Sequence, residues 1–354
     1  MVLPVTPPVS PMLAKAVPEV PAPDAVPGGL LYEPKWDGFR VIVFKDGDDV
    51  ELGSRGTKTL TRYFPELVEA ARRHLPARCV VDGEIVVRSG ETGQQKLDWD
   101  VLAQRIHPAD SRVRRLAEET PSEIVLFDLL ADGDDDLMSR PFAERRERLE
   151  SLFSTVGDGA ALHLTRTTRD PDLATRWFEQ FEGAGLDGVV AKPLAAAYQP
   201  GKRIMLKIKH HRTADVVVIG YRIHKSGRGV GSLLLGLYDG DGQLRQVGGS
   251  SAFSDARRLE LIDELEPLVA RDDSGERVVE EGERSRFTGS RDVSWVRLRP
   301  ELVAEVRYDQ LENGRFRHTV QIERWRPDRD PSSCRYDQLE VPTAYDLDEV
   351  LQAE

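Results

Sequence analysis

The fold is decided by a short stretch near the N-terminus, Glu33-Pro34-Lys35-Trp36-Asp37-Gly38-Phe39-Arg40. The runs at 30–35 and 39–44, which overlap its two ends, predict two strands. The Asp37-Gly38 pair lies between these runs and indicates a tight turn. The spacing Lys-x-Asp-Gly-x-Arg fixes four residue types, and chance supplies it in about one chain of this length in two hundred. The stretch alone leaves two interpretations open: a turn between strands, or a reaction site built around the lysine.

Further short motifs follow in a set order along the chain. They are Ser54-Arg55-Gly56, Asp82-Gly83-Glu84, Phe127-Asp128, Asp187-Gly-Val-Val-Ala-Lys192, Lys207-Ile-Lys209 and Arg326-Pro-Asp-Arg329. The second half adds Gly227-Arg-Gly-Val-Gly-Ser-Leu-Leu-Leu-Gly-Leu-Tyr-Asp239 and Arg317-His318. The ordered series resembles the nucleotidyltransferase motifs of ATP-dependent DNA ligases, and the second half is similar to the barrel domain of their compact bacterial stand-alone C type.

This resemblance implies an α+β fold. An ATP-grasp-like nucleotidyltransferase (adenylation) domain would occupy residues 1–210, and a C-terminal OB-fold β-barrel would occupy residues 211–354. The apolar pattern predicts the following elements: strands at 30–35, 39–44, 79–87, 123–130, 188–192 and 205–209, helices at 65–74, 142–153 and 171–183, then strands at 216–223, 233–238, 244–247, 303–309 and 318–326 with a helix at 254–265. A boundary with a hinge is expected near 210–213.

Composition excludes several classes of protein. The 354 residues suffice for two cored domains, and no apolar run approaches the roughly 18 residues of a membrane span. The proline-rich residues 1–29 lack the features of a signal peptide. Only two cysteines occur, Cys79 and Cys334, which is too few for a disulfide framework or a zinc site. A cytoplasmic location fits this composition, and the resemblance to bacterial DNA ligases implies the nucleoid.

The resemblance makes Lys35 the residue that captures AMP from ATP. A lysine attacks phosphorus as a neutral amine, and the positive charges of Lys207, Lys209 and a metal ion nearby would favour that form. AMP would then pass to the 5′-phosphate of nicked DNA, and the 3′-hydroxyl would displace it. These are in-line displacements that depend on positioning and charge.

Two carboxylates match the metal positions of the family, Glu84 and Asp187. Each would lie at a strand end facing a cleft and would hold Mg²⁺, for which Mn²⁺ can substitute, through oxygen ligands. The family usually has glutamate at position 187. The shorter aspartate arm, by about 1.3 Å, makes a bridging water between Asp187 and the metal an alternative to direct contact.

The remaining nucleotide contacts also come from the resemblance. Phe127 would stack on adenine, with simple core packing as the alternative, while Glu33 would read the adenine edge. Arg40, together with Glu84, would contact the ribose hydroxyls. The other expected phosphate or pocket contacts are Arg55, Lys192, Lys207, Lys209, Arg326 and Arg329. The last two would orient pyrophosphate and, lying in the second domain, require that domain to close and reopen.

The net charge of −12 argues against a uniform grip on DNA, since 61 acidic residues outnumber 49 basic ones. Residues 202–212 nevertheless carry five Lys/Arg, two His and no acid. Because the first motif starts at residue 33, we expect no separate clamping domain before it. The candidate DNA contacts are Arg55, Lys202, Arg203, Arg212, Arg222, Lys225 and Arg228. We expect a monomer that binds nicked double-stranded DNA weakly, with repair proteins as possible helpers.

Other functions remain open at this point. RNA ligases and RNA-capping guanylyltransferases share the lysine chemistry, although the barrel region disfavours both. A non-catalytic DNA-binding protein on a ligase scaffold would have no use for the retained Lys35, Glu84, Lys207 and Lys209. An NAD-dependent ligase would need a four-cysteine zinc site, which two cysteines cannot supply.

Overall fold

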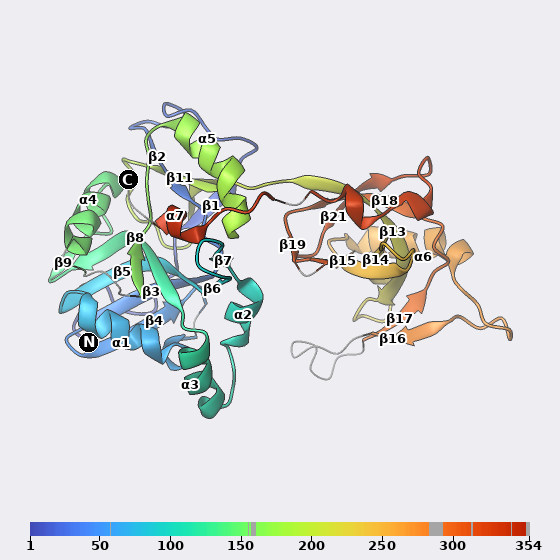
Figure 1. The fold of residues 1–354 in the computed structure, drawn as a ribbon, viewed down its shortest axis with the longest axis horizontal. Helices are drawn as coiled ribbons and strands as arrows, with labels where there is room; N and C mark the ends of the chain where they lie inside the picture. Colours follow the sequence, from blue (N-terminus) through green and yellow to red (C-terminus); the bar gives the residue numbers. More distant parts are fainter. Residues whose placement is uncertain are drawn as a thin grey trace. The chain divides into compact units, whose positions relative to one another are not determined.

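The structure, a computed structural model, describes residues 1–56, 58–154, 156, 161–282, 293–312, 314–340 and 342–351. The chain forms two compact units, shown in Figure 1. The first comprises Met1–Lys209 together with Pro342–Glu354, and the second comprises His210–Val341. Their first junction falls at residues 209 and 210, next to the boundary expected from the sequence. The mixture of helices and strands confirms the α+β class.

The first unit is built on two sheets. One sheet has the order β1-β12-β11-β2, with bounds β1 (Leu13–Ala16), β12 (Arg203–Ile208), β11 (Val189–Pro193) and β2 (Leu30–Pro34). The other has the order β10-β8-β5-β3-β4, with bounds β10 (Leu162–Leu164), β8 (Glu123–Asp132), β5 (Arg78–Val86), β3 (Phe39–Asp46) and β4 (Asp49–Ser54), while β9 (Asp135–Asp136) pairs with β8. Phe44 and Val80 from the second sheet share a buried cluster with Met205 from the first. The two sheets therefore face each other across this cluster.

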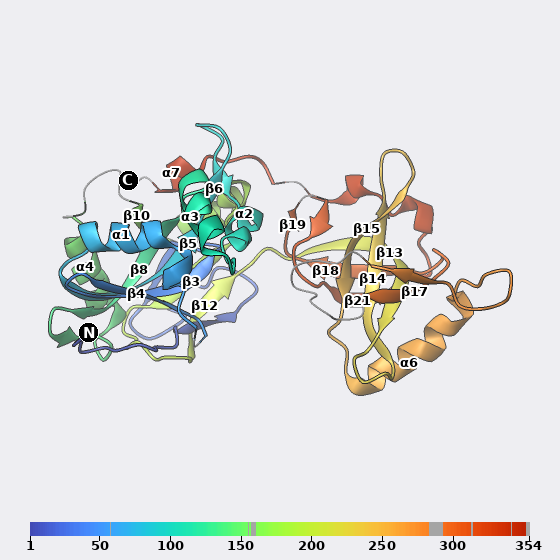
Figure 2. The ribbon, with the colours of Figure 1, turned by 90° about the horizontal axis from the view of Figure 1, so that it is seen from below.

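Helices cover the outer faces of both sheets (Figures 1 and 2). Their bounds are α1 (Pro65–His74), α2 (Trp99–Gln104), α3 (Asp110–Glu119), α4 (Phe142–Phe153) and α5 (Pro171–Gln180), with short turns η1 (Thr61–Tyr63) and η2 (Phe181–Ala184) and the small hairpin of β6 (Arg88–Ser89) and β7 (Lys96–Leu97). Leu67 of α1 and Leu149 of α4 pack on the second sheet. Trp177 of α5 packs on the first. The predicted helices at 65–74 and 142–153 are confirmed to the residue.

The Asp82-Gly83-Glu84 motif lies inside β5, and Glu84 pairs with Arg40 on one side and Val125 on the other. The expectation that Glu84 sits at a strand end is therefore wrong. A Cβ added at Gly83 would lie 2.7 Å from the carbonyl oxygen of Val125. Gly83 thus lets β8 approach closely, and β5 stays continuous through the polar Asp82-Gly83-Glu84 motif. In the sequence this motif looks like an interruption of the strand.

The C-terminal segment belongs to the first unit, which corrects the expectation that residues 211–354 form one domain. Residues 342–351 end in the short helix α7 (Leu347–Leu351), drawn in red beside the blue and green elements of that unit in Figure 1. Leu347 and Val350 are buried in the same cluster as Trp177. The Leu347 N–H donates to the Gln95 carbonyl at 2.9 Å. Burial of these two aliphatic side chains holds residues 342–351 against the first unit. So short a segment carries too little apolar pattern for this docking to be predicted from the sequence.

We expect Leu347→Ala to loosen this docking by about 2 kcal/mol or more, because it empties a fully buried site. That loss corresponds to roughly 30-fold faster hydrogen exchange at the Leu347 amide position, which bonds to Gln95. A matched control is Leu259→Ala, since Leu259 is 48% exposed on the surface. Unchanged exchange at residue 347 would show that the side chain does not anchor the tail.

The second unit is an antiparallel barrel-type sheet around one apolar cluster, and the long strand β13 is its centre. Strands β14, β17 and β18 all pair with β13. The bounds are β13 (Arg212–Ile223), β14 (Val230–Tyr238), β15 (Leu244–Ser250), β16 (Val279–Glu281), β17 (Ser294–Arg297), β18 (Val303–Tyr308), β19 (Leu311–Glu312), β20 (Arg315–Phe316) and β21 (Gln321–Trp325), with α6 (Asp255–Leu265), η3 (Glu266–Leu268), η4 (Pro331–Ser333) and η5 (Tyr336–Gln338). Within the described residues, no helix is long and apolar enough to span a membrane.

Candidate active site

Lys35 follows β2 directly and is fixed by the backbone of the segment before β11. Its N–H donates to the Gly188 carbonyl at 2.8 Å, and the Asp187 N–H donates to the Lys35 carbonyl at 3.0 Å. A Cβ added at Gly38 would lie only 2.0 Å from the Ile85 carbonyl oxygen. The turn after Lys35 can therefore approach β5 only with glycine at this position, which explains the Asp-Gly pair of the motif.

Three lysines expected from the sequence gather around one carboxylate. The Nζ atoms of Lys35 and Lys209 both lie 2.6 Å from Oδ2 of Asp187. Burial disfavours ionisation of Asp187, but the two ammonium groups outweigh it and lower the pKa of its carboxyl. Burial, reinforced by the charges of Lys209 and Lys35, lowers the pKa of Lys207. The site concentrates positive charge where a triphosphate would lie.

Glu84 faces the lysines from the other sheet. Burial raises the pKa of Glu84 to about 7, against the opposing charges of Arg40 and Lys35. The structure therefore brings Glu84 and Asp187 to the same site from β5 and from the segment before β11. Within the part of the chain that the structure describes, no group of three or more His, Cys, Asp or Glu side chains could hold a metal ion without further ligands.

A buried ion pair lies further along the same face of β2. The Nζ of Lys192 lies 2.7 Å from Oε2 of Glu33, and both side chains are 3% exposed. Burial raises the pKa of Glu33 and lowers that of Lys192. Oε1 of Glu33 has no hydrogen-bond partner among the described residues. A buried carboxylate oxygen without a partner is costly, so it points to a donor that a ligand supplies.

Phe127 is 5% exposed and lies beside this pair. The guanidinium carbon of Arg40 is 4.2 Å from its ring centroid, and the Nζ of Lys192 is 4.4 Å away. Both are cation–π contacts. Two cations contact the ring, so adenine stacking on Phe127 stays a prediction.

Arg55 is exposed directly after β4, and its charge contributes to the lowered pKa of Lys207, behind burial and the neighbouring lysines. It therefore lies on the side of the site that the lysines occupy. Lys202 and Arg203 are exposed at the start of β12.

Arg326 and Arg329 belong to the second unit, where both contact Asp215 of β13. Nη1 of Arg326 lies 3.1 Å from Oδ1 of Asp215, and Nε of Arg329 lies 3.4 Å from Oδ2. Arg326 also forms a two-bond fork with Asp328, which lowers the pKa of that carboxyl to about 2. Asp215 was not identified from the sequence, because an isolated aspartate in a strand carries no motif.

The other candidate DNA contacts differ in exposure. Lys225 and Arg228 are exposed in the turn between β13 and β14. Arg222 is half-buried, and Arg212 is paired with Glu340 at 2.8 Å. The turn thus presents the two most accessible of these cations in the second unit.

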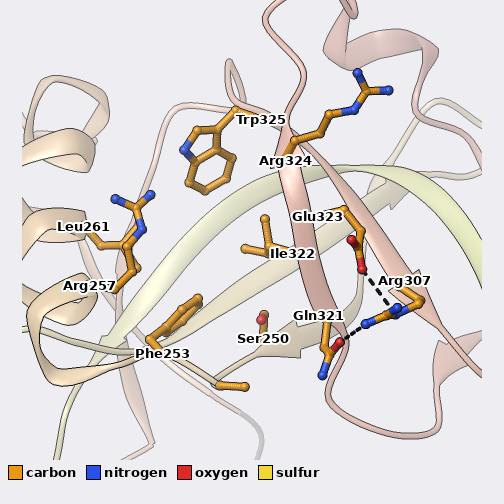
Figure 3. A pocket seen from close by; sticks show the side chains of 11 residues that line it. Ser250, Phe253, Arg257, Leu261, Arg307, Gln321, Ile322, Glu323, Arg324 and Trp325 are labelled. Atoms are coloured by element: carbon orange, nitrogen blue, oxygen red, sulfur yellow. Dashed lines mark hydrogen bonds and ion pairs between the residues drawn. The ribbon is translucent and has the colours of Figure 1, made fainter.

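Two pockets are prominent outside this site. One, of about 490 Å³, is lined by residues of the first unit that include Leu31, Arg146 and Thr168. The other, of about 470 Å³, lies in the second unit between α6 and β21 (Figure 3). Phe253 and Trp325 form apolar walls of this second pocket, and Arg307 is bonded there to Gln321 and paired with Glu323.

Comparisons with known proteins identify the family. Residues 11–209 match the model of the ATP dependent DNA ligase domain, and residues 226–329 match that of the ATP dependent DNA ligase C terminal region. The chain is 55% identical to DNA ligase C of Mycobacterium tuberculosis and 54% identical to DNA ligase C1 of Mycolicibacterium smegmatis, with 99% of both chains covered in each case. A solved structure of a Lig E DNA ligase shares the fold with a TM-score of 0.55 and 17% identity, covering 90% of this chain and 99% of that one. The chain belongs to the ATP-dependent DNA ligase family.

Proposed function

We propose that this enzyme forms a lysyl-AMP at Lys35 and uses it to seal nicks in double-stranded DNA. The observation that carries the proposal is the cluster of Lys35, Lys209 and Asp187, in which one carboxylate oxygen lies 2.6 Å from both ammonium groups. Such a cluster holds the nucleophile in place and surrounds it with charge that suits a triphosphate.

In the first step, Nζ of Lys35 loses its proton to solvent and attacks the α-phosphorus of ATP. A nitrogen–phosphorus bond forms, the bond between the α-phosphorus and the bridging oxygen breaks, and pyrophosphate leaves. Lys207 and Lys209 neutralise the charge that builds up on the phosphate oxygens. Asp187 keeps Lys35 and Lys209 side by side before the nucleotide arrives.

The adenine would lie over the face of the paired strands β2 and β11 that carries Glu33 and Lys192. Oε1 of Glu33 lacks a partner, and the exocyclic amino group of adenine is a donor that would satisfy it. Guanine presents a carbonyl oxygen at the corresponding position and would leave the oxygen unsatisfied. This difference favours ATP over GTP.

The carboxylates of Glu84 and Asp187 fit Mg²⁺ or Mn²⁺ when the phosphate oxygens of the nucleotide supply the remaining ligands. When bound, the metal withdraws charge from the reacting phosphate. Asp187 contacts two lysines, so Glu84 would be the main protein ligand, and Asp187 would act on the metal either directly or through a water. Glu84, with its pKa near 7, would release its proton on metal binding.

In the second step the 5′-phosphate oxygen of the nick attacks the AMP phosphorus and releases Lys35, and Arg55 would bind that phosphate. In the third step the 3′-hydroxyl attacks the activated 5′-phosphate, forms the phosphodiester and expels AMP. Arg326 and Arg329 would orient pyrophosphate in the first step. We further propose that the enzyme is a monomer. It would act in DNA repair at the nucleoid, together with other repair proteins.

The turn between β13 and β14 is proposed to contact DNA phosphates through Lys225 and Arg228. We expect the double change Lys225→Ala and Arg228→Ala to lower nick sealing about tenfold at physiological salt and to spare lysine adenylation. Removing two phosphate contacts would also reduce the log–log salt slope by about 1.8.

The control for this prediction is Arg271→Ala with Arg277→Ala, which makes the same change in net charge at two arginines that pair with Glu266. Both half-reactions are measured across a salt series. Equal losses in adenylation and sealing would place the turn in ATP binding or folding, and no loss in either would leave it as ordinary surface.

The proposed function is tested by incubating the protein with ATP labelled at the α-phosphate, then adding nicked DNA. Label should appear on the protein, pass to the 5′ end of the nick and leave as AMP. Label that appears with GTP equally well, or that transfers only to nicked RNA, would contradict the proposal.

A further inference from the structure

Asp82, the first residue of the Asp82-Gly83-Glu84 motif, is the fully buried centre of a hydrogen-bond network, and the motif resemblance gives it no role. Its Oδ1 accepts from Nε of Arg40 at 2.6 Å, and its Oδ2 accepts from Nη2 of the same arginine at 2.7 Å. A two-bond fork of this kind fixes the plane of the guanidinium group as well as its position.

The hydroxyl of Tyr198 completes the network. It donates to Oδ2 of Asp82 at 2.7 Å and accepts from the backbone N–H of Met12 at 3.0 Å. Tyr198 is 4% exposed and packs among the apolar residues between the two sheets. Because the Met12 N–H donates to this oxygen, the hydroxyl proton is directed at Asp82, so the loop after β11 and the chain before β1 together orient the aspartate.

The arginine held in this way points toward the nucleotide side of the site. Its guanidinium lies 4.2 Å from the Phe127 ring centroid, and its side chain is 21% exposed. Arg40 also lies directly opposite Glu84 in the β3–β5 pair. Asp82 uses Nε and Nη2, which leaves Nη1 for a hydroxyl acceptor on a ligand.

We propose that Asp82 and Tyr198 are positioning residues that hold the Arg40 guanidinium for recognition of the ribose hydroxyls of ATP. The inference rests on the adenylation proposed above. Neither residue touches the nucleotide in this account, and both act through Arg40. Asp82 and Tyr198 would therefore affect how well the enzyme distinguishes a ribonucleotide from a deoxynucleotide, because Arg40 supplies the contact to the ribose hydroxyls.

The test is the steady-state kinetics of lysine adenylation with ATP, 2′-deoxy-ATP and 3′-deoxy-ATP. Tyr198→Phe is expected to raise KM for ATP about tenfold with less than about a threefold change in kcat, and to raise KM less for whichever deoxy analogue lacks the recognised hydroxyl. Asp82→Asn keeps the size of the side chain and should have a larger effect in the same direction. Tyr32→Phe is the matched control, since Tyr32 is fully buried and its hydroxyl donates to the Pro21 carbonyl away from Arg40.

A second measurement separates positioning from folding. In an Arg40→Lys background, Tyr198→Phe should add little further loss, because the group that it orients is already gone. Equal KM increases for ATP and both analogues, full additivity with Arg40→Lys, or an unchanged KM in folded Tyr198→Phe would each overturn the inference. Failure of the wild-type protein to form the adenylate at all would instead overturn the proposed function.

Discussion

Lys35→Ala is expected to reduce protein adenylation below detection while the protein stays folded. Lys209 contacts the same oxygen of Asp187, but it follows the end of β12 rather than β2, so we expect that it does not replace Lys35 as the nucleophile. The Lys35 side chain is 18% exposed, and Asp187 keeps Lys209 as its partner when Lys35 is shortened. The free energy of unfolding should therefore change by about 1 kcal/mol or less.

Two variants make this result specific. Lys35→Arg keeps a positive charge beside Asp187 but removes the nucleophilic amine, so it should be as inactive as Lys35→Ala. Lys96→Ala removes an exposed lysine of β7 and should leave labelling intact. Acid-labile AMP on folded Lys35→Ala protein would show that another residue is the nucleophile.

Glu84→Ala is expected to reduce the rate of adenylation at least about 100-fold, since loss of even an outer-sphere partner of a metal typically costs 10–100-fold. Asp187→Glu should stay within about tenfold of the wild type. The longer arm adds one methylene and can still pair with Lys35 and Lys209. The measurement is single-turnover adenylation at saturating Mg²⁺.

Asp187→Asn serves as the matched comparison for Asp187→Glu. It keeps the shape of the side chain but removes the charge that holds two ammonium groups at 2.6 Å, so it should be far less active than Asp187→Glu. If Asp187→Glu were as inactive as Glu84→Ala, the view that this position tolerates either carboxylate would be wrong.

Much of the fold follows from local pattern. The amphipathic repeat at 142–153 predicted α4 with both ends correct. The helices α2 and α3 were not predicted, because α2 is only one to two turns long and the sequence of α3 is rich in charge, as in a solvated loop. The docking of residues 342–351 on the first unit was not predicted either, because it depends on a surface formed by distant parts of the chain.

The site could be predicted as a set of residue types but not as a set of contacts. The motifs named Lys35, Glu84, Asp187 and Lys209, and the structure brings all four together. The sequence could not show that Asp187 pairs with two lysines, because the charge partners lie 22 and 152 positions away. It also gave no reason to connect Tyr198 with Arg40, since their link runs through the buried Asp82.

The role proposed for Lys35 is to carry AMP from ATP to a nick. It is tested most directly by isolating protein labelled from α-labelled ATP, digesting it, and identifying the modified peptide before and after a chase with nicked DNA. We expect AMP on the peptide that contains Lys35, and we expect it to be lost during the chase as sealed DNA appears. AMP on a different peptide, or adenylated protein that does not discharge to nicked DNA, would contradict it.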